Sequence, residues 1–185
     1  MRVDRASIST LHEPAISGLI CEGISLVLDD AASPEWVDDY EIHDDPPVHD
    51  AKRLGKHRRR VDIKLASRRS RPRTRFSFEA KSLNANAGAA DYLGKEGLGQ
   101  FITGAYSADQ TVGGMLAYVQ TDDCDRWQAR IESKVDAAIH QLGLGGRWTK
   151  IAIVNQLTHT SQTIHKRPGK LRNIRIIHTM LDCTN

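Results

Sequence analysis

The sequence predicts an α/β domain with a central mixed β-sheet and helices on its faces. Apolar residues recur at helical spacing over residues 11–28 and 124–142, and at every second position over residues 60–66 and 75–81. A continuous apolar run at residues 115–119 is typical of a buried strand. The expected order is α–β–β–α–β–α–β–β, and 185 residues suit a single domain, residues 1–185.

The first third of the chain predicts one helix and one long loop. The helix over residues 11–28 begins at Thr10, which together with Glu13 resembles a capping box. Residues 29–59 are polar, contain three prolines and predict a loop that is first acidic and then basic.

Two alternating segments then predict a β-hairpin. Residues 60–66 (RVDIKLA) place Asp62 and Lys64 on one face, and residues 75–81 (RFSFEAK) place Ser77, Glu79 and Lys81 on one face.

The remaining elements follow from length and periodicity. Residues 89–106 predict a helix despite four glycines, and residues 124–142 predict an amphipathic helix. Residues 150–157 and 173–181 predict two strands, joined by the polar segment THTSQTIHKRPGK.

Charge is distributed very unevenly along the chain. The segment from Ala51 to Arg75 holds twelve Lys or Arg residues and one acid, Asp62, whereas residues 29–50 hold nine acids and no Lys or Arg. A solvated face or loop is the usual explanation of such runs, but a basic block around a single acid favours a polyanionic partner. The arginines expected to bind it are Arg58, Arg59, Arg60, Arg68, Arg69, Arg71 and Arg73.

Several classes of protein are excluded or disfavoured. No apolar run is long enough to span a bilayer and the N-terminus lacks a signal-peptide core, so we expect a cytoplasmic protein. Cys21, Cys124 and Cys183 have no zinc-site spacing and are expected to be reduced. No glycine-rich segment ends in the Gly-Lys-Ser/Thr of a phosphate-binding loop.

Asp62, Glu79 and Lys81 form the constellation that predicts chemistry. If the two hairpin strands pair, two carboxylates and one amine meet on one face. Neighbouring carboxylates repel each other, and a divalent cation with oxygen ligands, such as Mg²⁺, relieves that repulsion. Metal-bound water is a strong nucleophile toward phosphate esters, and Lys81 would orient or deprotonate it or neutralise the phosphate.

The Glu-x-Lys triplet is weak evidence by itself. A second one, Glu132 and Lys134, lies in the amphipathic helix, where a solvated charged face explains it. The triplet at Glu79 differs because it follows an aspartate-bearing strand, although a solvent-facing charged hairpin would show the same alternation.

RVDI followed by RFSFEAK resembles the PD-(D/E)xK nuclease superfamily, which includes restriction enzymes. Val61 stands where that family's pattern has proline. The segments YLGKEGLGQFITGAYS and GGMLAYV are similar to the helix and third strand of a group of bacterial members, so the resemblance covers about residues 58–120. It implies a restriction-endonuclease-like core of α-β-β-β-α-β type and Mg²⁺- or Mn²⁺-dependent hydrolysis of nucleic acid.

The resemblance also implies a set of site residues. Asp62, Glu79 and the carbonyl of Ala80 would hold the metal, and Lys81 would serve the attacking water. A further acid on the first helix is common in the family, which makes Glu13 a candidate metal ligand and Glu22 a weaker one. Gln100 is a candidate polar neighbour of the site.

Other polar residues have competing explanations. Tyr106 and Tyr118 are interpreted as core or rim residues. His159, His165, Lys166 and Arg167 are candidates for phosphate contact, with a solvated loop as the alternative.

The resulting hypothesis is a Mg²⁺-dependent endonuclease that acts on DNA rather than RNA. One alternative is a nuclease-fold module that binds without cleaving. Another is a subunit of a larger bacterial, antiphage defence complex or a homo-oligomer, silent until a partner activates it. In that case the acidic residues 29–50 would bind the partner or cover the basic block.

Overall fold

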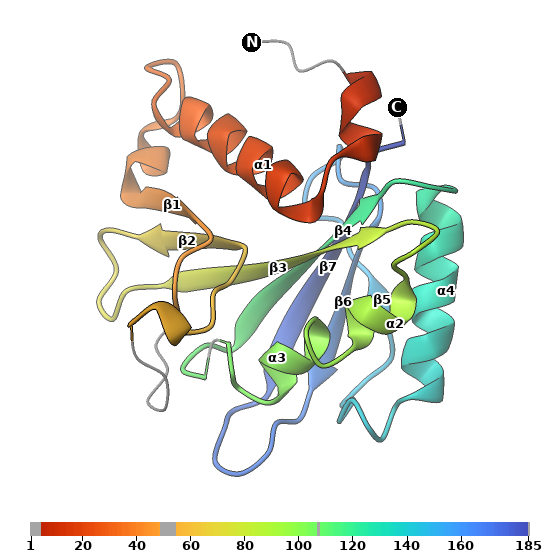
Figure 1. Cartoon of the computed structure of the whole chain (residues 1–185). Helices are drawn as coiled ribbons and strands as arrows, with labels where there is room; N and C mark the ends of the chain where they lie inside the picture. The colour runs from red at the N-terminus through yellow and green to blue at the C-terminus, as the bar shows by residue number, and fades with distance from the viewer. Residues whose placement is uncertain (1–4, 49–54, 107, 185) are drawn as a thin grey trace.

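A seven-stranded mixed sheet organises the molecule (Figure 1). The computed structural model describes residues 5–48, 55–106 and 108–184. The strand order is β1-β2-β3-β4-β7-β6-β5, and β4 pairs in parallel with both β3 and β7 while the other pairs are antiparallel. The predicted α/β fold with a helix-flanked mixed sheet is confirmed.

The elements are bounded as follows. The strands are β1 (Tyr40–Asp44), β2 (Ile63–Ser67), β3 (Arg75–Leu83), β4 (Val112–Val119), β5 (Thr149–Lys150), β6 (Thr160–His165) and β7 (Ile174–Asp182). The α-helices are α1 (Glu13–Leu28), α2 (Ala89–Leu93), α3 (Leu98–Ile102) and α4 (Cys124–Ala137). Three 3₁₀ segments, η1 (Arg5–Thr10), η2 (Glu35–Asp39) and η3 (Gly55–His57), complete the described chain.

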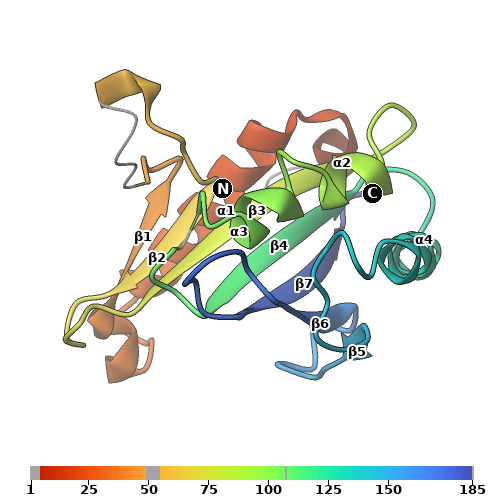
Figure 2. The same ribbon diagram turned by 90° about the horizontal axis from the view of Figure 1, so that it is seen from below.

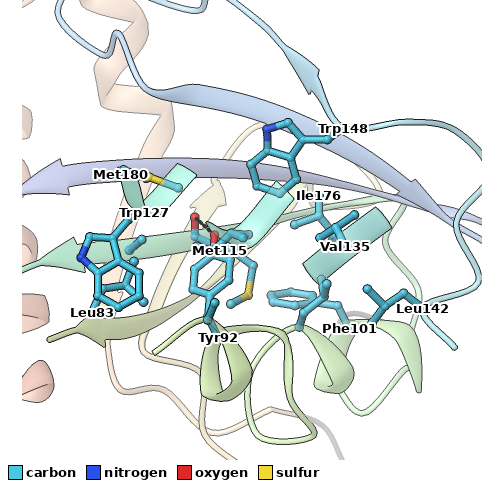
Figure 3. Close-up of a cluster of buried hydrophobic side chains, with 14 of the residues drawn as sticks. Leu83, Tyr92, Phe101, Met115, Trp127, Val135, Leu142, Trp148, Ile176 and Met180 are labelled. Carbon is cyan, nitrogen blue, oxygen red and sulfur yellow. Dashed lines mark hydrogen bonds between the residues drawn. The ribbon is translucent and has the colours of Figure 1, made fainter. Parts of the chain in front are cut away.

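Helices cover both faces of the sheet (Figures 1 and 2). Helix α1 packs on one face through a small cluster that includes Ile16, Ala80 and Tyr118. Helices α2, α3 and α4 lie on the other face over the main core, where Tyr92, Phe101 and aromatic and aliphatic side chains of α4 and the central strands interdigitate (Figure 3). Alternate residues of β3 therefore face different layers, and this alternation decides where Glu79 and Lys81 point.

The predicted loop over residues 29–59 is wrong in one important respect, because it contains the edge strand β1. Strand β1 pairs antiparallel with β2, with Ile42 opposite Leu65. The alternation in this strand (YEIHD) is limited to Tyr40 and Ile42 and ends in polar residues, which is too short to have predicted a strand. Part of this predicted loop, residues 49–54, lies outside the described residues.

The helix predicted over residues 89–106 is two short helices instead. Helix α2 ends at Leu93 with Gly94 as its C-cap residue, and a Cβ at Gly97 would stand 2.4 Å from the carbonyl oxygen of Tyr92. Glycine is therefore required for this tight turn into α3. After α3 the chain runs as a loop to β4, and Tyr106 belongs to that loop.

The C-terminal predictions are partly wrong. Helix α4 ends at Ala137, five residues early, and β5 (Thr149–Lys150) shares Lys150 alone with the strand predicted over residues 150–157. The predicted linker contains strand β6, whose buried positions are polar: Thr160, Ser161, Thr163 and His165. Strand β7 matches the prediction to within one residue at either end.

In the part of the chain that the structure describes, no helix combines the length and apolarity needed to cross a membrane.

Candidate active site

Asp62 stands just before β2, at the point where that strand leaves β3. It lies one position beyond the pair Ile63–Phe78, and in this antiparallel register it falls opposite Glu79. Its Oδ2 accepts a hydrogen bond of 2.6 Å from the backbone N–H of Ala80, and its carbonyl accepts one of 2.8 Å from the N–H of Asp45. Asp62 is therefore fixed to β3 by its side chain rather than by the strand ladder.

Glu79 is the most deeply buried acid of the site, with 5% of its surface exposed. Its Oε1 accepts a hydrogen bond of 2.9 Å from Lys81, and its buried Oε2 has no hydrogen-bond partner among the described residues. Burial, and then the charge of Asp62, raise the pKa of Glu79 to about 8. Burial is also the main reason that the pKa of Asp62 is raised.

Lys81 uses all three ammonium hydrogens. They are donated to Glu13 Oε1 at 3.0 Å, to Glu79 Oε1 at 2.9 Å and to the carbonyl of Ala80 at 2.8 Å. Burial lowers the pKa of Lys81, but the two carboxylates outweigh burial and the net shift is upward. Lys81 is therefore a charged ammonium in this arrangement.

Glu13 joins the site from the first turn of α1. Its Oε2 accepts a hydrogen bond of 2.8 Å from the backbone N–H of Ser82, while its Oε1 holds Lys81. The predicted capping box with Thr10 is wrong, because His12 is the N-cap residue of α1 and the Glu13 carboxylate is engaged across the sheet. Asp62 and Glu13 thus accept from alternate N–H groups of β3, along the edge that β2 leaves open.

The other predicted acid and amide do not join this cluster. Glu22 is exposed and lies nine residues further along α1, about 14 Å from Glu13 along the helix axis. Gln100 is buried, but its amide nitrogen donates to Glu96 at 2.7 Å. Tyr118 is a core residue that hydrogen-bonds Ser17 at 2.8 Å, as interpreted from the sequence.

Tyr106 is a core residue, as interpreted from the sequence, but its phenol also lies close enough to the acids of the site to feel their charge. It is 6% exposed, and after burial the largest influence raising the pKa of its phenol is the Glu79 carboxylate, followed by that of Asp62. No sequence pattern places it there, because it lies in the loop after α3, where spacing carries no orientation.

Among residues 5–48, 55–106 and 108–184, no three His, Cys, Asp or Glu side chains surround a common point as a metal cage would. The nearest arrangement has two carboxylates, Asp62 and Glu79, with a third, Glu13, turned to Lys81 and Ser82. An ion held here would have the two carboxylates and the Ala80 carbonyl as protein ligands and water for the rest, as Mg²⁺ tolerates.

The predicted nucleic-acid-binding arginines divide into two groups. Arg58, Arg59 and Arg60 lead directly to Asp62, and Arg60 pairs with Asp45 at 2.6 Å. The second group, Arg68, Arg69, Arg71 and Arg73, lies further along the chain from Glu79 than the first group does from Asp62. It forms the hairpin tip, and Arg73 is six residues before Glu79, about 20 Å along the strand.

The hairpin-tip arginines contact acids of the edge strand β1 and of the 3₁₀ segment η2 before it. Arg69 pairs with Asp39 at 2.6 Å, and Arg68 and Arg73 pair with Glu41 at 3.6 and 3.5 Å. Arg71 is exposed. Because these arginine side chains are largely exposed, each pair stabilises the fold by well under about 1 kcal/mol. Part of the acidic segment therefore does lie against part of the basic block.

The late basic residues have structural roles. His165 is fully buried in β6. Arg167 is 6% exposed and donates to the carbonyls of Arg172 and Gln110 at 2.6 and 2.8 Å. Both explanations offered by the sequence, phosphate contact and a solvated loop, are wrong for His165 and Arg167, because both side chains are buried. His159 faces Asp125 at 3.2 Å.

Comparison with protein-family models, with curated proteins and with solved structures finds no match to this chain.

Proposed function

We propose that this protein is a metal-dependent nuclease that hydrolyses phosphodiester bonds of nucleic acid, with DNA as its substrate. The observation that carries the proposal is the pairing of two carboxylates, Asp62 and Glu79, with a Lys81 ammonium on the same edge of one strand. The pKa values of both acids are raised, mainly by burial. Perturbed acids in such a cluster are typical of functional sites.

The donor set fits a hard divalent cation. Glu79 Oε2 is buried and without a partner among the described residues, which is costly unless a ligand completes it. Asp62, Glu79 and the Ala80 carbonyl would hold Mg²⁺ or Mn²⁺. When bound, such an ion supplies Lewis-acid activation of water and neutralises charge on the phosphate.

The protein's own groups prepare that chemistry. Asp62 and Glu79 approach each other because their strands are in register, and the hydrogen bond from Ala80 holds the Asp62 carboxylate in place. The positive charge of Lys81 is best used on the scissile phosphate or on a water beside it. Lys81 reaches either one by releasing one of its three acceptors, and Glu13 keeps it near the site meanwhile.

The Asp62, Glu79 and Lys81 pattern on adjacent strands, followed by a parallel strand β4, also fits the resemblance to PD-(D/E)xK nucleases. The proposal is tested by incubating the purified protein with plasmid, single-stranded DNA and RNA in Mg²⁺, Mn²⁺ or EDTA. Cleavage of DNA that EDTA abolishes is the expected result. No cleavage of any substrate with either metal would contradict the proposal.

A further inference from the structure

A cleft of about 600 Å³ opens on the α3 side of the sheet, beside the candidate site. Its floor includes Lys64 and Ser77, which are register partners in β2 and β3. Lys64 is two residues after Asp62 and Ser77 is two residues before Glu79, so each points to the same face as its acidic neighbour. The cleft therefore continues the site along the two strands, by about 7 Å per pair of residues.

The cleft has the chemistry of an anion site. Among the described residues, Arg58, Lys64 and Arg75 line it with a single carboxylate, Asp109. Arg75 and Asp109 pair at 3.9 Å, and both side chains are substantially exposed. None of the described residues that line the cleft is aromatic, so they offer no surface for base stacking.

Lys64 is the distinctive residue of this cleft. It is half-buried, and no carboxylate of the described residues lies within ion-pairing distance of its ammonium. Burial and the neighbouring charge of Arg75 lower its pKa, whereas Glu41 and Asp109 raise it. A partly desolvated ammonium without an ion pair is stabilised when an anion enters.

One wall of the cleft is held in place by residues that are distant in sequence. Residues 104, 105 and 108–110 form it, and the carbonyls of Gln110 and Asp109 accept hydrogen bonds from Arg167 and Arg172 at 2.8 and 2.9 Å. Both arginines come from the loop between β6 and β7, and the cleft is thus built by tertiary contacts.

We propose that Lys64, assisted by Arg75, binds a backbone phosphate of the substrate strand next to the scissile phosphate, which the ion held by Asp62 and Glu79 would contact. This inference rests on the proposed nuclease function and defines the path of the strand along β2 and β3. It assigns to Lys64 a binding role that the hairpin-tip arginines, some 20 Å from the site, were expected to supply.

The test is binding in EDTA, where no cleavage occurs, so that it is independent of catalysis. Fluorescence anisotropy of a labelled DNA duplex, and of the single strand and RNA of the same sequence, is measured over a series of salt concentrations. Lys64→Ala should weaken binding roughly tenfold at low salt and reduce the salt slope by about one, similarly for unrelated sequences. Lys64→Arg, which keeps the charge, should restore most of the affinity.

Lys150→Ala is the matched control, because Lys150 is exposed on β5 at the opposite edge of the sheet. Circular dichroism and thermal unfolding of each variant establish that it is folded. Wild-type affinity and slope in Lys64→Ala, or equal losses in Lys64→Ala and Lys150→Ala, would overturn the inference even if the enzyme cleaves DNA. A normal Lys64 effect in a protein that never cleaves would instead leave the inference standing and remove the nuclease proposal.

Discussion

Asp62 Oδ2 and the backbone N–H of Ala80 lie 2.6 Å apart, and this single contact closes the gap that β2 leaves beside β3. It places one carboxylate against the strand that carries the other. Glu13 repeats the arrangement at Ser82, two residues further on. The acids at this site thus complete the edge of a strand as well as forming a charged cluster.

Glu79→Gln should stabilise the protein in EDTA, increasingly so as pH rises. The folded-state pKa of Glu79, about 8, lies above the ordinary 4.5, so the folded state binds the proton more tightly than the unfolded state does. The stability gained from that proton is complete below the ordinary pKa and is lost as pH rises through the folded pKa. At about pH 9 the free energy of unfolding, measured in urea, should be higher for the variant by about 1–2 kcal/mol. This figure includes the cost of losing the ion pair with Lys81.

The same difference should nearly vanish at about pH 5, where the wild-type carboxyl is largely protonated when folded. Glu132→Gln, on the surface of α4, is the control and should show no such trend. Parallel stability curves for wild type and Glu79→Gln across this range would show that burial of Glu79 costs the fold nothing.

Glu13→Gln should separate positioning from metal binding. Because Glu13 contacts Lys81 and Ser82, we expect Mg²⁺ affinity to change by less than about threefold while kcat falls about tenfold. KM for DNA should stay near the wild-type value. Calorimetric Mg²⁺ titration and steady-state kinetics measure both, and a loss of Mg²⁺ affinity as large as that of Glu79→Gln would make Glu13 a ligand instead.

Thr163→Val should destabilise the fold by about 2–3 kcal/mol, because it breaks a buried hydrogen-bond chain. Thr163 Oγ1 contacts His165 Nε2 at 2.7 Å and His178 Nε2 at 2.8 Å. His165 Nδ1 must donate to the Leu142 carbonyl, so its Nε2 accepts from Thr163. The threonine oxygen then accepts from His178 Nε2, and His178 Nδ1 accepts from the Tyr92 hydroxyl at 3.0 Å.

Urea denaturation measures this cost, with Thr149→Val on the exposed strand β5 as the control. Nitrogen chemical shifts of the two histidine rings would report the expected tautomers, Nδ1–H for His165 and Nε2–H for His178. A Thr163→Val protein as stable as wild type would mean that the chain contributes nothing to the fold.

Arg167→Met should loosen the cleft wall without touching the site. The variant keeps the length and apolar stem of the side chain and loses the hydrogen bonds to Gln110 and Arg172. We expect a loss of about 1–3 kcal/mol in stability and faster amide exchange over residues 108–110. Lys166→Met, at the residue before Arg167, is the control. Unchanged amide exchange in Arg167→Met would contradict the conclusion that Arg167 holds the cleft wall in place.

The sequence could predict the hairpin and its polar face because strand periodicity is local. Asp62, Glu79 and Lys81 were placed together by alternation alone, and the structure brings them together. Glu13 was a candidate for the site, but the sequence also predicted that it forms a capping box with Thr10. The true partners, Lys81 and Ser82, are almost seventy residues away, and spacing near residue 13 contains no trace of them.

The errors in the sequence-based prediction share a physical cause. At these positions long-range tertiary contacts, rather than the local pattern of polar and apolar residues, decide the structure. Strand β6 is polar because its buried threonines and histidines satisfy one another. Strand β1 is acidic because it lies at the sheet edge beside the arginines of the hairpin tip. Tyr106 and Lys64 acquire their places from a loop and a cleft that exist only in three dimensions.

The most direct test of the central claim is the initial rate of Mg²⁺-dependent cleavage of a labelled DNA duplex by folded Asp62→Asn, Glu79→Gln and Lys81→Met proteins. Glu132→Gln and Lys134→Met, from the same Glu-x-Lys pattern on helix α4, are the matched controls. The account predicts losses of at least about a thousandfold for the first three and wild-type rates for the two controls. Wild-type cleavage by any of the three site variants, or equal losses in the controls, would contradict it.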